Sequence, residues 1–223
     1  MMLGTVLVVE SSTEEGSVAL LSSGEVAASV DFSARDKVSG ARTEAIGPAV
    51  AECLARAGVP ARELSAVICG AGPGGFTSLR CAAAVAKGLC SALAIPLYAV
   101  SSLELMAWSA PAREGALIVA ISAGRGEWFT AVVRCDAEGR REIGAATLLS
   151  EAGLRSLAPH KAAILAGEGL EMELHPRAEA ALMCIGRILD GGPVPLDTWE
   201  PTYGRLAEAQ VKWEAAHGRA LPV

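Results

Sequence analysis

The sequence predicts an α/β protein made of two similar units, and three observations support this. The chain has 223 residues, which fits one large domain or two small lobes. Hydrophobic residues make up 52% and charged residues 20%, the balance of a folded globular chain. The same order of strands, helix, strand, glycine-rich loop and helix occurs twice along the chain. This order indicates an internal duplication whose loops face each other across a cleft.

The first unit opens with an antiparallel meander of three strands. Polar turns separate three short β-rich runs, at residues 6–9, 17–21 and 26–32. Apolar residues at helical spacing then predict a helix over residues 41–57, which Gly58 and Pro60 end. A buried strand (64–69), a glycine-rich loop (70–75), a helix (77–93), a further strand (95–100) and a helix start in a capping-box pattern (101–104) complete the unit.

The second unit repeats this order more weakly. Its predicted elements are strands at 117–121, 128–134 and 142–149, a short helix at 151–157, a strand at 162–166 that ends in Gly167-Glu168-Gly169, and a closing helix at 177–189. Gly191, Gly192 and Pro193 then break the chain. We therefore predict an N-terminal lobe (1–104), a smaller C-terminal lobe (105–198) and a C-terminal tail (199–223).

Charge and composition exclude several classes of function. The net charge is −6, which disfavours autonomous binding to a nucleic acid, because phosphate contacts supply most of that affinity. No apolar run reaches the roughly 18 residues of a membrane-spanning helix, and the N-terminus lacks the charged region of a signal peptide. We expect a cytoplasmic protein with no membrane partner. The six cysteines include no CxxC pair and are interpreted as buried thiols.

The loop Gly70-x-Gly72-Pro73-Gly74-Gly75 lies between a buried strand and a helix. Such a loop can bind a phosphate through its N–H groups, or its glycines can serve only sharp turning and close packing. It lacks the Lys-Ser or Lys-Thr of a P-loop and the spacing of a dinucleotide fingerprint. The residues that would line a vestigial nucleotide site are Glu10, Ser11, Ser12, Gly70, Gly72 and Gly74. Weak binding of ATP or ADP stays an alternative, and no cofactor is firmly indicated.

The paired acids of a phosphoryl-transfer cleft are missing. Glu10 ends the first strand, but the matching turn of the second unit carries Ser122. A lone Glu10 is interpreted as a solvated turn residue rather than a metal ligand. The three histidines lie in separate segments without HxxxH spacing, and no serine lies in a GxSxG elbow, which argues against a metallopeptidase or a serine hydrolase.

The helix at 77–93 carries small residues around most of its circumference, from Cys81 to Ala92. Such a helix allows close approach of another helix. Two interpretations stay open: burial inside its own lobe, or a flat protein–protein surface made together with the helix at 41–57.

Several stretches of the chain resemble the TsaB family, also called YeaZ. They are Val67 to Arg80 (VICGAGPGGFTSLR), Ala84 to Leu89 (AVAKGL), Val100 to Glu104 (VSSLE) and the opening Glu10 to Leu20 (ESSTEEGSVAL). The likeness is specific over residues 6–104. Beyond residue 116 it is carried by Gly126-Glu127, Gly167-x-Gly169, Pro176-Arg177-Ala178 and Glu200-Pro201-x-Tyr203-x-Arg205.

The resemblance implies an actin-like ATPase (ASKHA) fold of two duplicated ribonuclease-H-like lobes. It also implies a non-catalytic partner subunit of the bacterial complex that transfers a threonylcarbamoyl group to N6 of adenosine 37, in tRNAs that read codons beginning with A. The implied partners are a catalytic TsaD-like paralogue, a TsaE-like ATPase and, when alone, a second copy of the chain. The tRNA is bound only through the complex. A nucleotide-binding ATPase or phosphotransferase of the same fold is the alternative.

The resemblance further implies that the two helices of the first lobe form the association surface. The implied interface residues are Arg42, Ile46, Ala49, Cys53, Thr77, Arg80, Ala83, Ala84 and Lys87. Several positions depart from the family pattern: Glu10 replaces Asp, Arg42 replaces His, Ser122-Ala123-Gly124 replaces Asp-Ala-Arg, and Gly75 and Ser78 replace Ser and Gly. The changes at 122 and 124 remove charged groups from the cleft, which is compatible with a scaffold subunit.

Overall fold

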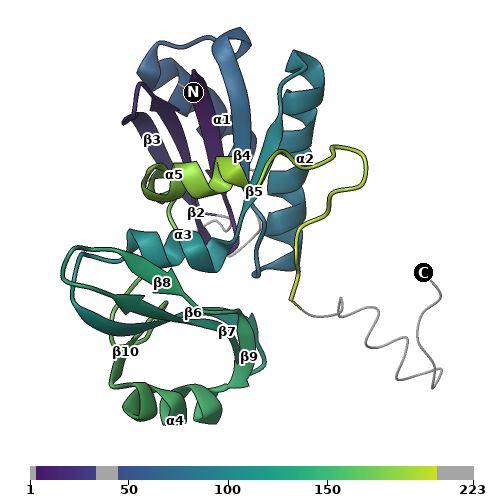
Figure 1. Ribbon diagram of the computed structural model, residues 1–223. Helices are drawn as coiled ribbons and strands as arrows, with labels where there is room; N and C mark the ends of the chain where they lie inside the picture. The colour runs from purple at the N-terminus through teal and green to yellow at the C-terminus, as the bar shows by residue number, and fades with distance from the viewer. Residues whose placement is uncertain (1–3, 34–44, 205–223) are drawn as a thin grey trace, which may run out of the picture.

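The computed structural model describes residues 4–33 and 45–204 of the chain. Figure 1 shows two sheets in two lobes, the first lobe above and the second below. The first sheet has five strands in the order β3-β2-β1-β4-β5. Its strands are β1 (Thr5–Glu10), β2 (Glu15–Ser22), β3 (Glu25–Ser33), β4 (Leu64–Gly70) and β5 (Leu97–Val100).

The pairing of the first sheet confirms the predicted meander. Strands β1, β2 and β3 are antiparallel neighbours, whereas β4 runs parallel to β1 and β5 runs parallel to β4. Strand β5 begins at Leu97 rather than at the predicted residue 95. Pro96 precedes it and has no N–H group to donate to the sheet. The carboxyl ends of β1 and β4 therefore meet at one edge, where the glycine-rich loop begins.

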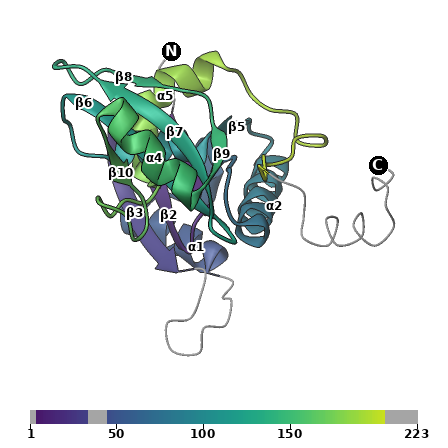
Figure 2. The same cartoon turned by 90° about the horizontal axis from the view of Figure 1, so that it is seen from below.

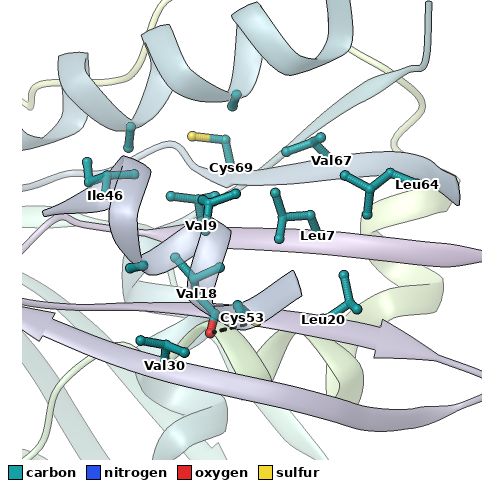
Figure 3. Packing of buried hydrophobic residues seen from close by; sticks show 14 of the residues in the cluster. Leu7, Val9, Val18, Leu20, Val30, Ile46, Cys53, Leu64, Val67 and Cys69 are labelled. Atoms are coloured by element: carbon teal, nitrogen blue, oxygen red, sulfur yellow. Dashed lines mark hydrogen bonds between the residues drawn. The ribbon is translucent and has the colours of Figure 1, made fainter. Parts of the chain in front are cut away.

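Helices α1 (Ile46–Ala57) and α2 (Phe76–Leu93) cover one face of this sheet and contact each other. Their inner residues join the apolar side chains of the strands in one buried cluster, in which Leu7, Val9 and Val67 are fully buried. Figure 3 shows side chains from both layers pointing toward one another in this cluster. A 3-10 turn, η1 (Ala61–Glu63), connects α1 to β4.

The opposite face of the first sheet is covered by α3 (Ser102–Ser109), the 3-10 turn η2 (Ala178–Ala180) and α5 (Ala181–Asp190). The sequence placed the closing helix in the second lobe. In the structure its buried residues Cys184 and Ile188 pack against Val6 and Val8 of β1, and Figure 1 shows α5 lying across the first sheet. Helix α5 has its apolar residues on one side. That side is buried against the face of the first sheet that α1 and α2 leave free.

The second sheet has the order β10-β6-β7-β8, with β9 paired to the same side of β7. Its strands are β6 (Gly115–Gly124), β7 (Glu127–Cys135), β8 (Arg141–Ile143), β9 (Thr147–Ser150) and β10 (Ala163–Ala166). The single strand predicted at 142–149 is wrong. It is divided into β8, which pairs with β7 at residues 133–135, and β9, which pairs with β7 at residues 127–130. Gly144, whose N–H still donates to the Val132 carbonyl (2.8 Å), begins the irregular segment between them.

Helix α4 (Glu151–Lys161) covers the outer face of the second sheet, as Figure 2 shows. It begins after Ser150, whose hydroxyl accepts the Gly153 N–H (3.2 Å) as an N-cap, and it extends four residues beyond the predicted end. Helix α3 packs on the inner face of the sheet. Each lobe thus has a β-meander, a helix and a parallel strand in the same order, which confirms the predicted duplication. No described helix is both long and apolar enough to cross a membrane.

After α5 the chain runs back along the first lobe. Residues 193–204, which we call the strap, leave α5, pass the edge of β5 and the side of α2, and reach the second sheet at Gly204 (Figures 1 and 2). The rest of the predicted C-terminal tail, from residue 205, lies outside the described residues.

Candidate functional site

Glu10 lies at the carboxyl end of β1 and is fully buried, so the interpretation as a solvated turn residue is wrong. Its Oε1 accepts the Ser12 N–H (2.6 Å), and its Oε2 accepts the Ser102 hydroxyl (2.9 Å). The Ser102 oxygen in turn accepts the Gly72 N–H (3.1 Å). This chain of hydrogen bonds joins the β1 turn, the glycine-rich loop and the start of α3.

Burial raises the pKa of Glu10, and hydrogen bonds from Ser12 and Ser102 oppose this shift. A carboxyl group in such a place is costly to ionise, since it has lost its hydration. The hydrogen bonds that it accepts recover part of that cost. Glu10 is therefore a structural hub of the turn region, built from a residue type that is rarely buried.

Three of the four glycines of the loop are required by close packing. A Cβ at Gly70 would lie 2.0 Å from Glu10 Oε2, and a Cβ at Gly74 would lie 2.4 Å from the Ser12 carbonyl oxygen. Gly72 has a φ of +84°, and a Cβ there would lie 2.5 Å from the Thr202 carbonyl oxygen of the strap. The packing interpretation of these glycines therefore agrees with the structure at all three positions.

The N–H groups of the loop are directed into the protein. The Ala71 N–H donates to the Val100 carbonyl (2.7 Å), the Gly72 N–H to Ser102, and the Gly75 N–H to the Ser12 carbonyl (2.8 Å). A phosphate cradle needs such donors to be free. Gly72 and Pro73 are joined by a cis peptide bond. The loop thus uses three of its donors to hold the turn, α3 and β5 together.

The matching turn of the second lobe is built differently. Ser122 is exposed, and its hydroxyl accepts the nearby Gly124 N–H (3.2 Å). Ser11 and Ser12 of the first lobe are almost fully buried. Within residues 4–33 and 45–204, no group of three or more His, Cys, Asp or Glu side chains is arranged to hold a metal ion.

Four of the predicted interface residues lie inside the lobe instead. Ile46, Ala49 and Cys53 of α1 belong to the core against the first sheet, and Figure 3 shows Ile46 and Cys53 pointing at the strands. The Cys53 thiol donates to the Val18 carbonyl (3.8 Å). Ala83 of α2 is only 5% exposed. Ile46, Ala49 and Cys53 pack inward because the sheet lies beneath them. A small residue such as Ala83 does not reveal from the sequence whether it faces the protein or the solvent.

Other predicted interface residues do lie on the surface. Thr77, Arg80 and Ala84 of α2 are exposed, whereas Lys87 is half-buried, with its Nζ 5.8 Å from the centre of the Trp199 ring. Arg42 lies outside the described residues. We define the outer helical face by eleven of the exposed residues of the two helices: Gly47, Pro48, Ala51, Glu52, Ala55 and Arg56 of α1, and Thr77, Arg80, Cys81, Ala84 and Gly88 of α2. Phe76, Ser91 and Ala92 of α2 are exposed as well and lie outside this set.

Five of the six cysteines are buried as predicted, and Cys81, on the outer helical face, is exposed. Burial raises the pKa of Cys90 to about 11 and that of Cys184 to about 12, so both are protonated near pH 7. The prediction of a buried thiol is wrong for Cys81, because helical spacing places it four residues after Thr77 on the solvent side.

The role of Ser102 was not predicted from the sequence. The capping-box pattern predicts a helix cap at Ser101-Ser102, but Ser101 makes no side-chain capping bond, and Ser102 binds Glu10 and Gly72 instead. The contact between the strap and the loop, where the Thr202 N–H donates to the Ala71 carbonyl (2.7 Å), was not predicted either. Both contacts join residues far apart in the chain, so no local pattern could reveal them.

The two lobes share an arrangement in which a strand meander is followed by a helix and a parallel strand. In the first lobe the glycine-rich loop follows β4 and leads into α2. This architecture defines a protein of the actin-like ATPase fold, as predicted. Residues 36–179 match the family model described as TsaD, tRNA N6-adenosine threonylcarbamoyltransferase. Together with the relatives described next, this match makes the chain a member of the TsaB (YeaZ) family of actin-like proteins.

Two curated relatives bear the name tRNA threonylcarbamoyladenosine biosynthesis protein TsaB. The relative from Escherichia coli K12 is 33% identical over 136 residues, which cover 60% of this chain and 57% of the relative. The relative from Haemophilus influenzae is 35% identical over 133 residues, covering 58% of this chain and 54% of the relative. The chain thus matches little more than half the length of these relatives.

The similarity of structure extends further along the chain. YeaZ from Pseudomonas aeruginosa superposes with a TM-score of 0.73 at 28% identity, covering 90% of this chain and all of that one. A second structure, described as an uncharacterized protein with similarity to peptidase YEAZ from Pseudomonas aeruginosa, gives a TM-score of 0.75 at 27% identity, with 91% and 100% covered. Both lobes are therefore shared with these solved structures.

Proposed function

We propose that this protein acts in the biosynthesis of threonylcarbamoyladenosine in tRNA, as a non-catalytic subunit that associates with a TsaD-like catalytic paralogue. The outer helical face is the surface of that association. A TsaE-like ATPase joins the complex, and the chain pairs with a second copy of itself when no paralogue is present. The names of the similar curated proteins support the pathway, and the geometry of the two regions described above supports the division of roles.

The glycine-rich loop supports a role without nucleotide turnover. Three of its N–H groups already donate within the protein, and Glu10 is turned inward to bind Ser12 and Ser102. A nucleotide phosphate at the loop would have to replace these internal bonds, each of which contributes roughly 0.5–1.5 kcal/mol. The alternative of an ATPase or phosphotransferase is therefore less favoured by this geometry than a scaffold.

The outer helical face supports association, and this surface is the single observation that carries the proposal. Its residues are mostly small, so that a partner helix can approach closely. The face carries three charged residues. Glu52 and Arg56 pair within α1 at 2.5 Å, and the Arg80 guanidinium lies 5.3 Å from the centre of the Phe76 ring. A surface of mostly small residues over two neighbouring helices fits a helical partner of the same fold.

Charge supports indirect contact with tRNA. The net charge of −6 gives the chain no overall attraction for a polyanion. Most of the affinity for tRNA then has to come from the partner subunits. The isolated chain should bind tRNA weakly at physiological salt in a gel-shift titration, and submicromolar binding by the chain alone would contradict this part of the proposal.

Co-purification with a matched pair of variants tests the association surface. Ala84→Glu places a bulky charge on the outer helical face, and Ala152→Glu places the same charge on an exposed position of α4 in the second lobe. We expect Ala84→Glu to abolish capture of the TsaD-like paralogue by the tagged chain, with its melting temperature unchanged, because an interfacial charge without a partner is costly. Ala152→Glu should capture the paralogue like the parent chain. Equal capture by both variants would refute the proposed surface.

A further inference from the structure

The strap is fastened to the first lobe along most of its length. The Val194 N–H donates to the Leu97 carbonyl (2.8 Å), which extends the first sheet by one bridge beyond β5. Val194, Leu196 and Trp199 pack against the buried cluster beneath α2. This part of the strap is therefore anchored by the same apolar core that holds α2.

The end of the strap closes over the glycine-rich loop and the first turn of α2. The Thr202 N–H donates to the Ala71 carbonyl (2.7 Å). The Tyr203 ring lies 4.5 Å, centre to centre, from the ring of Phe76, and the Tyr203 hydroxyl donates to Glu200 Oε2 (3.0 Å). An aromatic pair of this kind contributes roughly 0.5–1.5 kcal/mol beyond its buried area. The motif Glu200-Pro201-x-Tyr203 is thereby used for docking rather than for chemistry.

The last described residue of the strap contacts the second lobe. Gly204 has a φ of +72°, and a Cβ there would lie 2.4 Å from the Phe129 ring. Phe129 belongs to β7 and is buried in the core of the second lobe, with 4% exposure. The backbone of the strap therefore lies directly on a side chain of the opposite lobe, at a position where a larger residue does not fit.

We propose that the strap is a clasp that fixes the angle between the two lobes, and that it opens while both lobes stay folded. The chain itself crosses between the lobes twice, between α3 and β6 and between β10 and η2. The strap adds a third connection between the lobes, and its contact with the second lobe is non-covalent. Thr202 and Gly204 are exposed and Tyr203 is half-buried, so few contacts have to break when its end detaches. Detachment releases the Ala71 carbonyl and allows the lobes to move about the two remaining crossings.

A pair of glycine variants isolates the contact between strap and second lobe. Gly192 and Gly204 have nearly the same backbone conformation, with φ of +76° and +72°. A Cβ at Gly192 meets nothing within 4 Å, whereas a Cβ at Gly204 meets the Phe129 ring. Gly192→Ala and Gly204→Ala therefore share the backbone strain of an alanine at positive φ, and they differ in the displacement of the strap from Phe129.

The angle between the lobes can be measured with two spin labels. Cys81 is the exposed cysteine of α2, and Ser156→Cys adds a second exposed thiol on α4 of the other lobe. In the Ser156→Cys background we expect one narrow distribution of label distances for the parent chain and for Gly192→Ala. Gly204→Ala should broaden or shift that distribution, and the Thr202 amide should exchange its hydrogen about tenfold faster than in Gly192→Ala.

Identical distance distributions and exchange rates for the two glycine variants would overturn the clasp. If Gly204→Ala fails to fold, Tyr203→Ala decides instead, since it removes the ring contact with Phe76 and adds no atoms. Tyr203→Phe, which keeps the ring, is its control. Labels that report the same interlobe distance in Tyr203→Ala and Tyr203→Phe would equally refute the clasp. These measurements are made on labelled chain at a concentration at which size-exclusion chromatography shows a monomer, so their outcome is separate from the proposed association with a paralogue or with a second copy.

Discussion

The glycine-rich loop lies at the N-terminal end of α2, and the outer helical face runs along the solvent side of α1 and α2; the function that the geometry of each region supports differs from its sequence signal. The loop has the stronger motif, yet its donors bind Val100, Ser102 and Ser12 inside the protein. The outer helical face has no motif beyond small residues, yet its side chains are open to solvent. The contrast teaches that a sequence motif typical of a ligand site can bind a ligand only when the hydrogen-bond donors of the motif are free.

The sharpest test of this contrast lies within α2 itself, at two neighbouring alanines. Ala83 is 5% exposed and Ala84 is exposed. Ala83→Glu forces a carboxylate into the lobe and should lower the free energy of unfolding by about 3 kcal/mol or more. Ala84→Glu should change it by less than about 0.5 kcal/mol, as surface substitutions generally do. Urea unfolding of the two variants measures both values, and similar losses would mean that the assigned faces of α2 are wrong.

A second pair of variants tests how tightly the loop is closed. A Cβ at Gly70 overlaps the carboxylate of Glu10, whereas at Gly75, in the same loop, the nearest contact is 3.5 Å away and φ is −62°. We expect Gly70→Ala to cost about 2–3 kcal/mol of unfolding free energy, because the buried Glu10 carboxylate has to shift away from the new methyl group and lose its hydrogen bonds to Ser12 and Ser102. Gly75→Ala should cost less than about 1 kcal/mol. A thermal melt that leaves Gly70→Ala as stable as Gly75→Ala would show that the Glu10 hub is not packed as described.

The titration of Glu10 gives a smaller effect with a definite sign. Burial raises its pKa above the ordinary value of 4.5, so the folded state resists ionisation more than the unfolded state does. This contribution to stability is fully present below pH 4.5 and is lost as the pH rises through the folded pKa. The glutamine in Glu10→Gln cannot ionise, so the stability of this variant does not fall in this way as the pH rises.

The measurement compares urea unfolding of the parent chain and Glu10→Gln from pH 4.5 upward. The unfolding free energy of the parent should fall relative to that of Glu10→Gln as the pH rises. Glu142→Gln, at an exposed position of β8, should follow the parent chain throughout. Parallel pH profiles for the parent and Glu10→Gln would show that Glu10 does not titrate from a buried position.

The sequence predicted the elements of the first lobe well, because strand alternation, helical spacing and glycine punctuation are local signals. The meander, β4 and α2 agree with their predicted ranges to within one or two residues. The duplication was likewise visible as a repeated order of elements. The prediction was wrong where pairing between strands decides the structure. One strand was expected at 142–149, and the chain forms β8 and β9 instead, on either side of the segment that begins at Gly144.

The candidate site was predicted less completely, and the reasons are physical. Glu10, Gly70, Gly72 and Gly74 were found, but their spacing could not show that the carboxylate points inward to Ser102. The small residues of α1 and α2 were found as well. Their division between core and surface depends on where the sheet lies, and Ile46, Cys53 and Ala83 fell on the buried side. The docking of α5 on the first sheet joins distant segments and leaves no local pattern.

The most direct test of the proposed association uses the native thiols. Five cysteines are buried and Cys81 lies exposed on the outer helical face, so a thiol reagent should modify one cysteine quickly in the folded chain when it is diluted until it is monomeric. Adding the purified TsaD-like paralogue should slow the modification of Cys81 by about tenfold or more, in proportion to the fraction of chain bound. The Ala84→Glu variant should keep its fast modification at the same paralogue concentration. Stable complex formation that leaves Cys81 as reactive as in the free chain would contradict the association through α1 and α2.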